Sequence, residues 1–293
     1  MPKTVLVTGA GGQLGSELRL RSGQTEGYDF TFIGRSHVDF ADRKSIEGYF
    51  EDKSFDIIIN CAAYTAVDKA ESEPAIAGAV NHRAVEALAH IAKTKGISLI
   101  HISTDYVFDG GNFKPYTENE PTNPQGVYGQ TKLDGEEAMR SINPPRSAIV
   151  RTSWLYSSFG NNFVKTMLRL GSERDELGVV FDQVGTPTYA RDLAIALLEI
   201  LPRLKGDGTE VYHYSNEGVC SWYDFAKAIF ELAGIECDIK PIETRDYPTP
   251  ATRPHYSLLN KAKIKRDHGV AIPYWRDSLK ACLENLGENI GVH

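Results

Sequence analysis

Residues 7–18, VTGAGGQLGSEL, limit the folds open to this chain more than any other segment. A β-branched run leads into three glycines, Gly9, Gly12 and Gly15, spaced G-x-x-G-x-x-G, and a helical pattern follows directly. In this strand–turn–helix context a dinucleotide places its pyrophosphate on the helix N-terminus. We expect Gly9 to permit the tight turn, Gly12 to permit close approach of the pyrophosphate, and Gly15 to let helix and strand pack closely. The alternative is a glycine turn without a ligand.

The end of the second predicted strand, FIGRSHVDF at residues 32–40, indicates which nicotinamide cofactor fits. An NAD-specific site usually has an acidic residue here that binds the ribose hydroxyls. This chain has Arg35 instead, and a guanidinium suits a 2′-phosphate. The pattern therefore favours NADPH, while Asp39, close behind, keeps use of NADH open.

Strand and helix patterns alternate through the first half of the chain. Apolar runs at 3–10, 28–35, 55–63, 97–104 and 147–156 are separated by amphipathic segments at 13–21, 42–52, 74–96 and 128–139. This rhythm predicts an α/β fold, a Rossmann-like doubly wound parallel sheet over residues 1–154. Beyond it the rhythm weakens, so residues 155–293 are expected to form mainly a smaller C-terminal substrate-binding lobe, with some segments returning to the sheet. The Gly- and Pro-rich loop at 109–125 is a candidate functional loop.

Composition excludes several classes of function. The 293 residues carry a formal net charge of −7, which gives no support to a nucleic-acid surface. We also expect no membrane partner, because no apolar run approaches the roughly 20 residues needed to span a bilayer. Four widely spaced cysteines form no C-x-x-C pair, so reduced thiols are expected. With a first strand at residue 3 and no leader pattern before it, the expected location is cytoplasmic.

The heptapeptide GVYGQTK at residues 126–132 places Tyr128 four residues before Lys132. On a helix the two side chains share one face. A nearby ammonium would lower the pKa of the phenol, which would then suit a proton donor to a developing alkoxide. By itself this spacing is more typical of a solvated tyrosine beside a solvated lysine on an ordinary helix.

Several longer motifs carry a family resemblance. The runs TGAGGQLG, NCAAYTAVDKAE, ISTDYVFDG and VYGQTK together resemble the extended short-chain dehydrogenase/reductase family. The further runs RTSWLY, GNNFVKTML, DQVGTPTYARDLA and YPTPATRP are similar to those of its dTDP-4-dehydrorhamnose reductases. The resemblance extends over nearly the whole chain, in order and at similar spacing.

The resemblance implies a reaction and the residues for it. In that family NADPH delivers a hydride to the C4 carbonyl of a dTDP-linked 4-keto-6-deoxy sugar, giving dTDP-L-rhamnose. The tyrosine of Y-x-x-x-K donates the proton, which maps to Tyr128, and the lysine, here Lys132, binds the nicotinamide ribose. The family's Thr-Asp pair falls on Thr104 and Asp105, and Thr104 would hydrogen-bond the carbonyl oxygen. This constellation turns the interpretation of GVYGQTK from an ordinary pair into a catalytic one.

The resemblance also implies binding residues on both sides of the reacting centre. On the cofactor side they are Gly12, Gln13 and Leu14 at the phosphates, Asp39 and Phe40 near the adenosine, and Ala62, Ala63, Tyr64 and Thr65 beside the nicotinamide half. On the substrate side they are Trp154, Asn162, Gln183 and Arg253. The Arg253 guanidinium suits a pyrophosphate because it can bind two oxygens at once, although a solvated surface arginine is an equal reading of the residue alone.

Three departures from relatives refine the prediction. Sugar-nucleotide 4,6-dehydratases have a glutamate after the Thr-Asp pair, and this chain has Tyr106, so reduction is favoured over dehydration. No cysteine matches the Cys–His pair of GDP-fucose synthases. Some reductases dimerise through Mg²⁺ held by glutamates; Glu17 matches one, but Arg191 stands near another, which argues against the metal. We therefore expect a monomer or a homodimer without a bridging metal.

Two other functions remain open at this stage. The regulatory β subunit of methionine adenosyltransferase resembles the same family and binds NADP as a non-catalytic partner. The other alternative is a reductase of a different nucleotide-4-keto sugar. The presence of Thr104, Tyr128 and Lys132 together favours an enzyme over a binding subunit.

Overall fold

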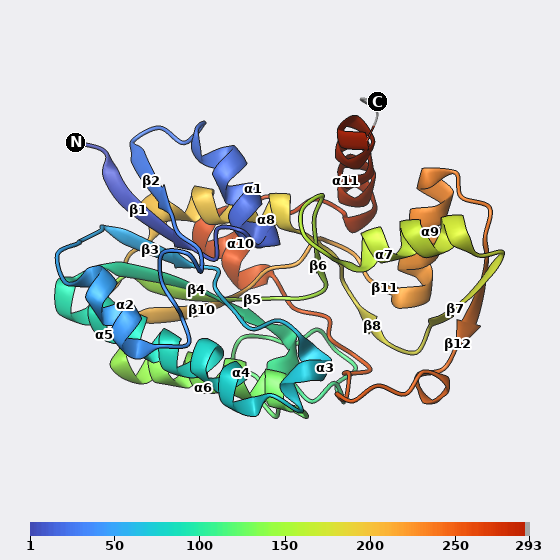
Figure 1. Cartoon of the computed structure of the whole chain (residues 1–293), viewed down its shortest axis with the longest axis horizontal. Coiled ribbons are helices and arrows are strands. Elements are labelled where there is room, and N and C mark those ends of the chain that lie inside the picture. Colours follow the sequence, from blue (N-terminus) through green and yellow to red (C-terminus); the bar gives the residue numbers. More distant parts are fainter. Residues whose placement is uncertain (291–293) are drawn as a thin grey trace.

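A computed structural model of the chain describes the backbone of residues 1–290 and the side chains of residues 1–287. Within this range the central sheet has six parallel strands in the order β10-β5-β4-β3-β1-β2 (Figure 1). They are β1 (Lys3–Thr8), β2 (Tyr28–Phe32), β3 (Ile57–Asn60), β4 (Ser98–Thr104), β5 (Ser147–Thr152) and β10 (Thr209–His213). The strand order reverses between β1 and β3, and ligands of such sheets bind at the carboxyl ends beside that reversal.

Helices cover both faces of this sheet (Figure 1). On one face lie α1 (Gln13–Ser22), α8 (Ala190–Ile200) and α10 (Ala262–His268), whose Leu18, Leu197 and Ile264 share a buried apolar cluster with β1. On the other face lie α2 (Arg43–Phe50), α5 (Ala84–Lys95) and α6 (Val127–Ile142), whose Phe50, Leu88 and Met139 pack on Leu6 and Ile58. Strands buried on both sides explain the continuous apolar runs, and the predicted doubly wound fold is confirmed.

The predicted helix at 74–96 is divided into three segments. An α-helix, α4 (Pro74–Gly78), passes into a π-helical turn, η1 (Ala79–Arg83), and then into α5. The helix ends where Gly96 takes the left-handed conformation, with φ at +69°. π-Helical turns inside helices are frequent at functional sites, and this one presents Asn81 to the loop that follows β3.

The second half of the chain forms a lobe beside the sheet. Its core joins α7 (Phe163–Glu173), α9 (Trp222–Ala233) and α11 (Trp275–Ile290) with β7 (Glu176–Val180), which pairs in parallel with β12 (Asp238–Ile242). Two smaller pairs complete it, β6 (Leu155–Tyr156) with β9 (Thr188–Tyr189) and β8 (Val184–Gly185) with β11 (Cys220–Ser221). The segments α8, β10 and α10 return to the sheet. The division at residue 154 stays a proposal, and residues 291–293 of the proposed lobe lie outside the described residues.

Within residues 1–290, no helix is both long enough and apolar enough to cross a bilayer.

Candidate active site

The glycine-rich turn leaves no room for side chains at two of its glycines. Gly9 has φ at +66°, and a Cβ there would lie 2.6 Å from the backbone carbon of Cys61 at the end of β3. A Cβ on Gly15 would lie 2.8 Å from Ala10 Cα, so α1 packs directly on the turn. Both findings agree with the sequence expectation for these two residues.

The third glycine begins the helix. Gly12 N–H donates to Gly9 O at 2.9 Å, and Gly12 is the N-cap of α1 without any side-chain cap. The backbone N–H groups of the first helical turn therefore carry no side-chain cap, as a pyrophosphate-binding helix end requires. Gln13 and Leu14 are the first two residues of that turn, so the turn fits the pyrophosphate of a dinucleotide.

Asn162 holds the phosphate turn against the lobe. Its side-chain Nδ2 donates to Gln13 Oε1 at 2.9 Å and to Ser157 O at 2.7 Å. Its Oδ1 accepts from Lys165 N–H at 3.1 Å, which caps α7. These hydrogen bonds link the glycine-rich turn to the lobe through Asn162. Its contact with a substrate stays a prediction.

The three adenosine-side residues have different environments. Arg35 and Asp39 are exposed after β2, whereas Phe40 is 7% exposed and packs in the core beneath α2. The Asp39 carboxylate accepts from Ala41 N–H at 2.9 Å and so shapes its own loop. The exposed Arg35 guanidinium is the cation nearest along the chain to the end of β2, where a 2′-phosphate would lie.

The nicotinamide-side loop after β3 is held by a residue that the sequence reading missed. Asn81, on the π-helical turn, accepts from Tyr64 N–H at 2.9 Å and donates to Tyr64 O at 3.1 Å. The same amide group donates to Thr131 Oγ1 of α6 at 3.2 Å. Asn81 therefore ties this loop to the helix that carries Tyr128. The sequence gives little signal for it, because Asn81 is followed by the polar residues His82 and Arg83 of the same amphipathic segment.

Other residues of this loop are fixed from both ends. Ala62 N–H donates to Thr8 Oγ1 at 3.2 Å, and the Tyr64 hydroxyl donates to Glu73. Ala63 is half-buried and Thr65 is exposed. The loop is thus anchored to β1 on one side and to the start of α4 on the other.

The predicted catalytic residues meet at the carboxyl end of β4. The Tyr128 side chain is hydrogen-bonded to Thr104, and its ring meets that of Tyr106 edge-on at a centroid distance of 5.4 Å. Thr104 Oγ1 donates to Asp105 Oδ1 at 3.0 Å. This close approach depends on Gly129, because a Cβ there would overlap Tyr106 O and lie 3.0 Å from Pro124.

Burial shifts the pKa values of Tyr128 and Asp105. It raises the pKa of Tyr128 to about 12, partly offset by the hydrogen bond from Thr104. It also raises the pKa of Asp105 to about 6, against the hydrogen bond from Thr104. The expected lowering of the Tyr128 pKa by Lys132 is therefore wrong for this structure, because desolvation outweighs any effect of the lysine.

Lys132 lies in the interior, 1% exposed. Its Nζ donates to Ile102 O at 2.6 Å and lies 3.3 Å from His101 Nε2. Burial lowers the pKa of Lys132 to about 8, opposed by the charge of Glu136. Tyr128 and Lys132 share one face of α6 as predicted, but the lysine is bonded to β4.

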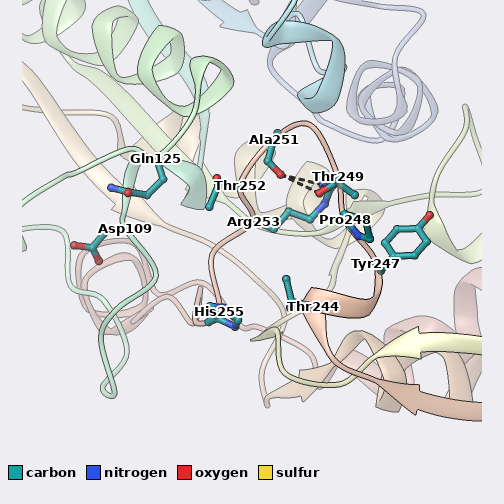
Figure 2. A pocket seen from close by; sticks show the side chains of 10 residues that line it. All are labelled: Asp109, Gln125, Thr244, Tyr247, Pro248, Thr249, Ala251, Thr252, Arg253 and His255. Carbon is teal, nitrogen blue, oxygen red and sulfur yellow. Dashed lines mark hydrogen bonds between the residues drawn. The ribbon is translucent and has the colours of Figure 1, made fainter.

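Arg253 lines a cavity of about 300 Å³ between the C-terminal Pro-rich loop and the loop at 109–125 (Figure 2). Its guanidinium binds both oxygens of Asp68, at 3.1 and 2.8 Å, and donates to Thr249. Ala251 N–H donates to the same Asp68 carboxylate at 3.2 Å. Asp68 belongs to the short helix α3 (Val67–Ala70), so this contact, 185 residues apart in the chain, joins the lobe to the nicotinamide side. Across the cavity lie Asp109 and Gln125 of the predicted functional loop.

The two remaining substrate-side candidates lie deeper in the lobe. Trp154 has φ at +48° and stacks on Trp222 at a centroid distance of 3.6 Å. Such a conformation costs free energy in a bulky residue and clusters at functional sites. Gln183 is 4% exposed and donates to Thr244 Oγ1 at 3.1 Å, beside the cavity wall.

Glu17, which matches a magnesium ligand of some relatives, is a buried carboxylate. Glu17 is 2% exposed and accepts from Ser157 Oγ at 2.6 Å. Burial raises the pKa of Glu17, and the charges of Arg21 and Arg191 oppose this rise. No cluster of three or more His, Cys, Asp or Glu suited to a metal ion occurs in the described part of the chain. The four cysteines are free thiols.

Comparison with known proteins adds to this geometry. The family model described as RmlD substrate binding domain matches residues 3–288. The dTDP-4-dehydrorhamnose reductase of Sinorhizobium fredii (strain NBRC 101917 / NGR234) is 44% identical over 282 residues, covering 94% of each chain. A solved dTDP-4-dehydrorhamnose reductase from Clostridium acetobutylicum ATCC 824 is 41% identical with a TM-score of 0.91, covering 97% of this chain and 99% of that one. Another, from Bacillus anthracis in complex with NADP, is 37% identical with a TM-score of 0.91, covering 97% and 100%.

Proposed function

The chain belongs to the RmlD substrate binding domain family, and from that premise we propose that it is an NADPH-dependent dTDP-4-dehydrorhamnose reductase. It would reduce the C4 ketone of dTDP-4-dehydro-6-deoxy-L-mannose (dTDP-6-deoxy-L-lyxo-4-hexulose) to dTDP-L-rhamnose, the last step of dTDP-rhamnose biosynthesis. The observation that carries the proposal is the meeting of Thr104 and Tyr128 above buried Lys132, at the carboxyl end of β4, in a chain with reductase relatives at 41–44% identity.

The residues divide the work of the reaction. Bound NADPH supplies the hydride that adds to C4 of the sugar. Negative charge would then grow on the C4 oxygen. The Thr104 hydroxyl, which donates to Asp105 in this structure, would turn to donate to that oxygen, and the new hydrogen bond would strengthen as the charge develops. Tyr128, protonated at neutral pH because burial raises its pKa to about 12, gives its proton to that oxygen. Lys132, on the same face of α6, would return a proton to Tyr128, and Asp105 holds the Thr104 hydroxyl until the substrate binds.

The cofactor contacts proposed here follow the strand ends. Gly9, Gly12, Gln13, Leu14 and Gly15 support the pyrophosphate, and Ala62, Ala63, Tyr64 and Thr65 border the nicotinamide half. Arg35, with Asp39 and Phe40, receives the adenosine end.

Arg35 carries the proposed preference for NADPH, and the NADP complex of the Bacillus anthracis relative is consistent with it. Michaelis constants for NADPH and NADH, compared between the wild type and Arg35→Ala, test this choice. A wild-type preference for NADH, or an unchanged ratio in the variant, would refute it.

The substrate contacts proposed here begin at the cavity and continue into the lobe. Arg253 would bind the sugar-nucleotide pyrophosphate, and Gln183, Asn162 and Trp154 would contact the rest of the molecule. In dehydratases of the wider family a glutamate follows the Thr-Asp pair, and here Tyr106 packs against Tyr128 instead. A tyrosine with an edge-on ring contact supplies no carboxylate for water elimination, which supports simple reduction.

The decisive experiment follows NADPH absorbance after addition of the dTDP-linked 4-keto-6-deoxy sugar, with the GDP-linked analogue as control. Oxidation with the dTDP compound alone is expected. Oxidation with the GDP compound instead would indicate a reductase of another nucleotide-4-keto sugar. Tight NADPH binding without oxidation of either would favour a regulatory subunit like that of methionine adenosyltransferase.

We further propose a cytoplasmic enzyme that is a monomer or a homodimer without a bridging Mg²⁺. The support is Arg191, whose positive charge acts on the Glu17 carboxyl group that would have to bind the metal. The molecular mass in solution, measured with and without chelator, tests this. Dissociation caused by the chelator would contradict the proposal.

A further inference from the structure

A row of buried polar side chains crosses three strands of the sheet and ends at Lys132. Thr8 on β1, Asn60 on β3 and His101 on β4 are direct register partners on adjacent parallel strands. Their exposed fractions are 0%, 2% and 0%. Thr8 Oγ1 lies 2.6 Å from Asn60 Oδ1, Asn60 Nδ2 lies 3.1 Å from His101 Nδ1, and His101 Nε2 lies 3.3 Å from Lys132 Nζ. Polar groups buried this deeply are costly unless each donor meets an acceptor.

Each hydrogen bond of the row is donated in the same direction, from Ala62 and Thr8 toward His101. Ala62 N–H, which can only donate, donates to Thr8 Oγ1 at 3.2 Å. The Thr8 hydroxyl donates to Asn60 Oδ1 at 2.6 Å, and in this orientation the Asn60 amide nitrogen faces His101. Asn60 Nδ2 consequently donates to His101 Nδ1, so in the neutral imidazole the proton is carried by Nε2.

The last bond of the row has a consequence for Lys132. His101 Nε2–H points at Lys132 Nζ, and it needs a lone pair as acceptor. A neutral amine has a lone pair and can still donate to Ile102 O, whereas an ammonium has none. An ammonium would set two donors against each other in a site with almost no solvent.

We propose that Thr8, Asn60 and His101 are positioning residues that form a directed hydrogen-bond row and make Lys132 a ready proton donor to Tyr128. The row favours the amine form of Lys132 and so eases release of its proton. The hydrogen-bond row itself does not depend on the proposed function. Only the use of the released proton, which is to reprotonate Tyr128 after reduction, rests on it. After Tyr128 gives its proton to the substrate oxygen, one Lys132 N–H bond breaks, the phenolate regains an O–H, and the new amine lone pair accepts from His101 Nε2–H.

Other groups around Lys132 act in the opposite direction. Glu136, one turn further along α6, favours the charged lysine, and so does Cys61 at the end of β3 when ionised. Glu136 is itself bound by Arg151 at 2.6 Å and by Ser103, which spreads its charge over two other partners. Burial lowers the pKa of Lys132 to about 8, so its ammonium is a stronger acid than that of a solvated lysine.

The first test reads the tautomer of His101 directly. ¹⁵N NMR of histidine-labelled protein, with His101→Gln used to assign the signal, should show the proton on Nε2 in the wild type. Thr8→Val has nearly the same shape but no hydroxyl, so the Asn60 amide is free to turn and the proton should move to Nδ1. Thr8→Ser keeps the hydroxyl and should keep the Nε2 tautomer. A wild-type proton on Nδ1, or the same tautomer in the serine and valine variants, would overturn the proposal.

The second test is the pH dependence of kcat. Turnover should fall as pH rises through the pKa of Lys132, and Thr8→Val should move this fall upward by about one to two pH units, since a charge-assisted hydrogen bond replaces a repulsive contact. Thr8→Ser should restore the wild-type profile. A uniform loss of kcat in Thr8→Val, with no shift of the profile, would show a merely structural role and refute the proposal. A wild-type protein without reductase activity but with the expected tautomers would instead refute the proposed function alone.

Discussion

In the proposed cofactor half of the site the residues follow strands of one parallel sheet, whereas in the proposed substrate half they come from loops far apart in the chain. Gly9 follows β1, Ala62 follows β3, and Thr104 ends β4, so adjacent strands deliver them to one edge. Arg253, by contrast, is held by Asp68, which is 185 residues away in the sequence. The sheet fixes the first set through backbone register, while the second set depends on individual side-chain contacts. Substitutions that disturb the backbone should therefore impair the cofactor half, and substitutions that remove a side chain should impair the substrate half.

The largest expected effect is at the junction of the two halves. Tyr128→Phe removes the hydroxyl bonded to Thr104 but keeps the ring contact with Tyr106. We expect kcat to fall roughly 100- to 10,000-fold, the range for loss of a positioned proton donor. Binding of NADPH and of the nucleotide sugar should both persist, as measured by titration. Unchanged turnover would contradict the assignment of Tyr128 as proton donor.

The next change should affect only the cofactor half. Gly9→Ala places a Cβ 2.6 Å from the Cys61 backbone at a residue with φ of +66°, which should cost about 2–4 kcal/mol of folding free energy and weaken NADPH binding. The matched control is Gly11→Ala, where a Cβ meets no atom within 4 Å. Urea unfolding and NADPH titration measure both effects. Equal behaviour of the two variants would show that the turn is not sterically restricted.

A side-chain change should affect only the substrate half. Arg253→Met removes the guanidinium that lines the cavity and should raise KM for the nucleotide sugar about 10- to 100-fold, the size of a charge-assisted hydrogen bond. The KM for NADPH should stay unchanged. Asp68→Asn keeps Arg253 but loosens its hold, so its effect should be smaller and in the same direction. A parallel rise of both Michaelis constants in Arg253→Met would erase the distinction between the halves.

The smallest effect concerns stability at the junction. The folded-state pKa of Asp105 is about 6, raised from 3.8 mainly by burial. The carboxyl is protonated in both folded and unfolded states below pH 3.8, so its destabilising effect appears between pH 4 and 6 and is complete above pH 6. Asp105→Asn should therefore gain about 1–2 kcal/mol relative to the wild type over that interval, while losing activity.

Urea unfolding of both proteins at several pH values measures the difference. A difference that shrinks between pH 4 and 6 would contradict the burial argument.

Local sequence patterns predicted the cofactor half well. The glycine spacing identified the turn, and the apolar runs identified the buried strands, because both features depend on a few neighbouring residues. The same patterns did not predict Asn81, His101 or Asp68. Their partners lie between 17 and 185 residues away, and nothing in the nearby sequence distinguishes a linking asparagine or histidine from a solvated one.

The relation between Tyr128 and Lys132 shows where the local argument stops. Their spacing of four residues correctly placed both on one face of α6. It predicted a lowered tyrosine pKa, but the structure raises it, because the free energy of removing a phenolate from water depends on everything that packs around it.

Chain-local information was thus sufficient for the parallel sheet and the glycine-rich turn, whereas the proposed proton donor also required the family resemblance. These features follow from backbone conformation and from a spacing of a few residues. The charge states of Asp105, Tyr128 and Lys132, and the hold of Asp68 on Arg253, were decided by folding. They depend on the depth of burial and on hydrogen-bond partners that only the packing of distant segments brings together.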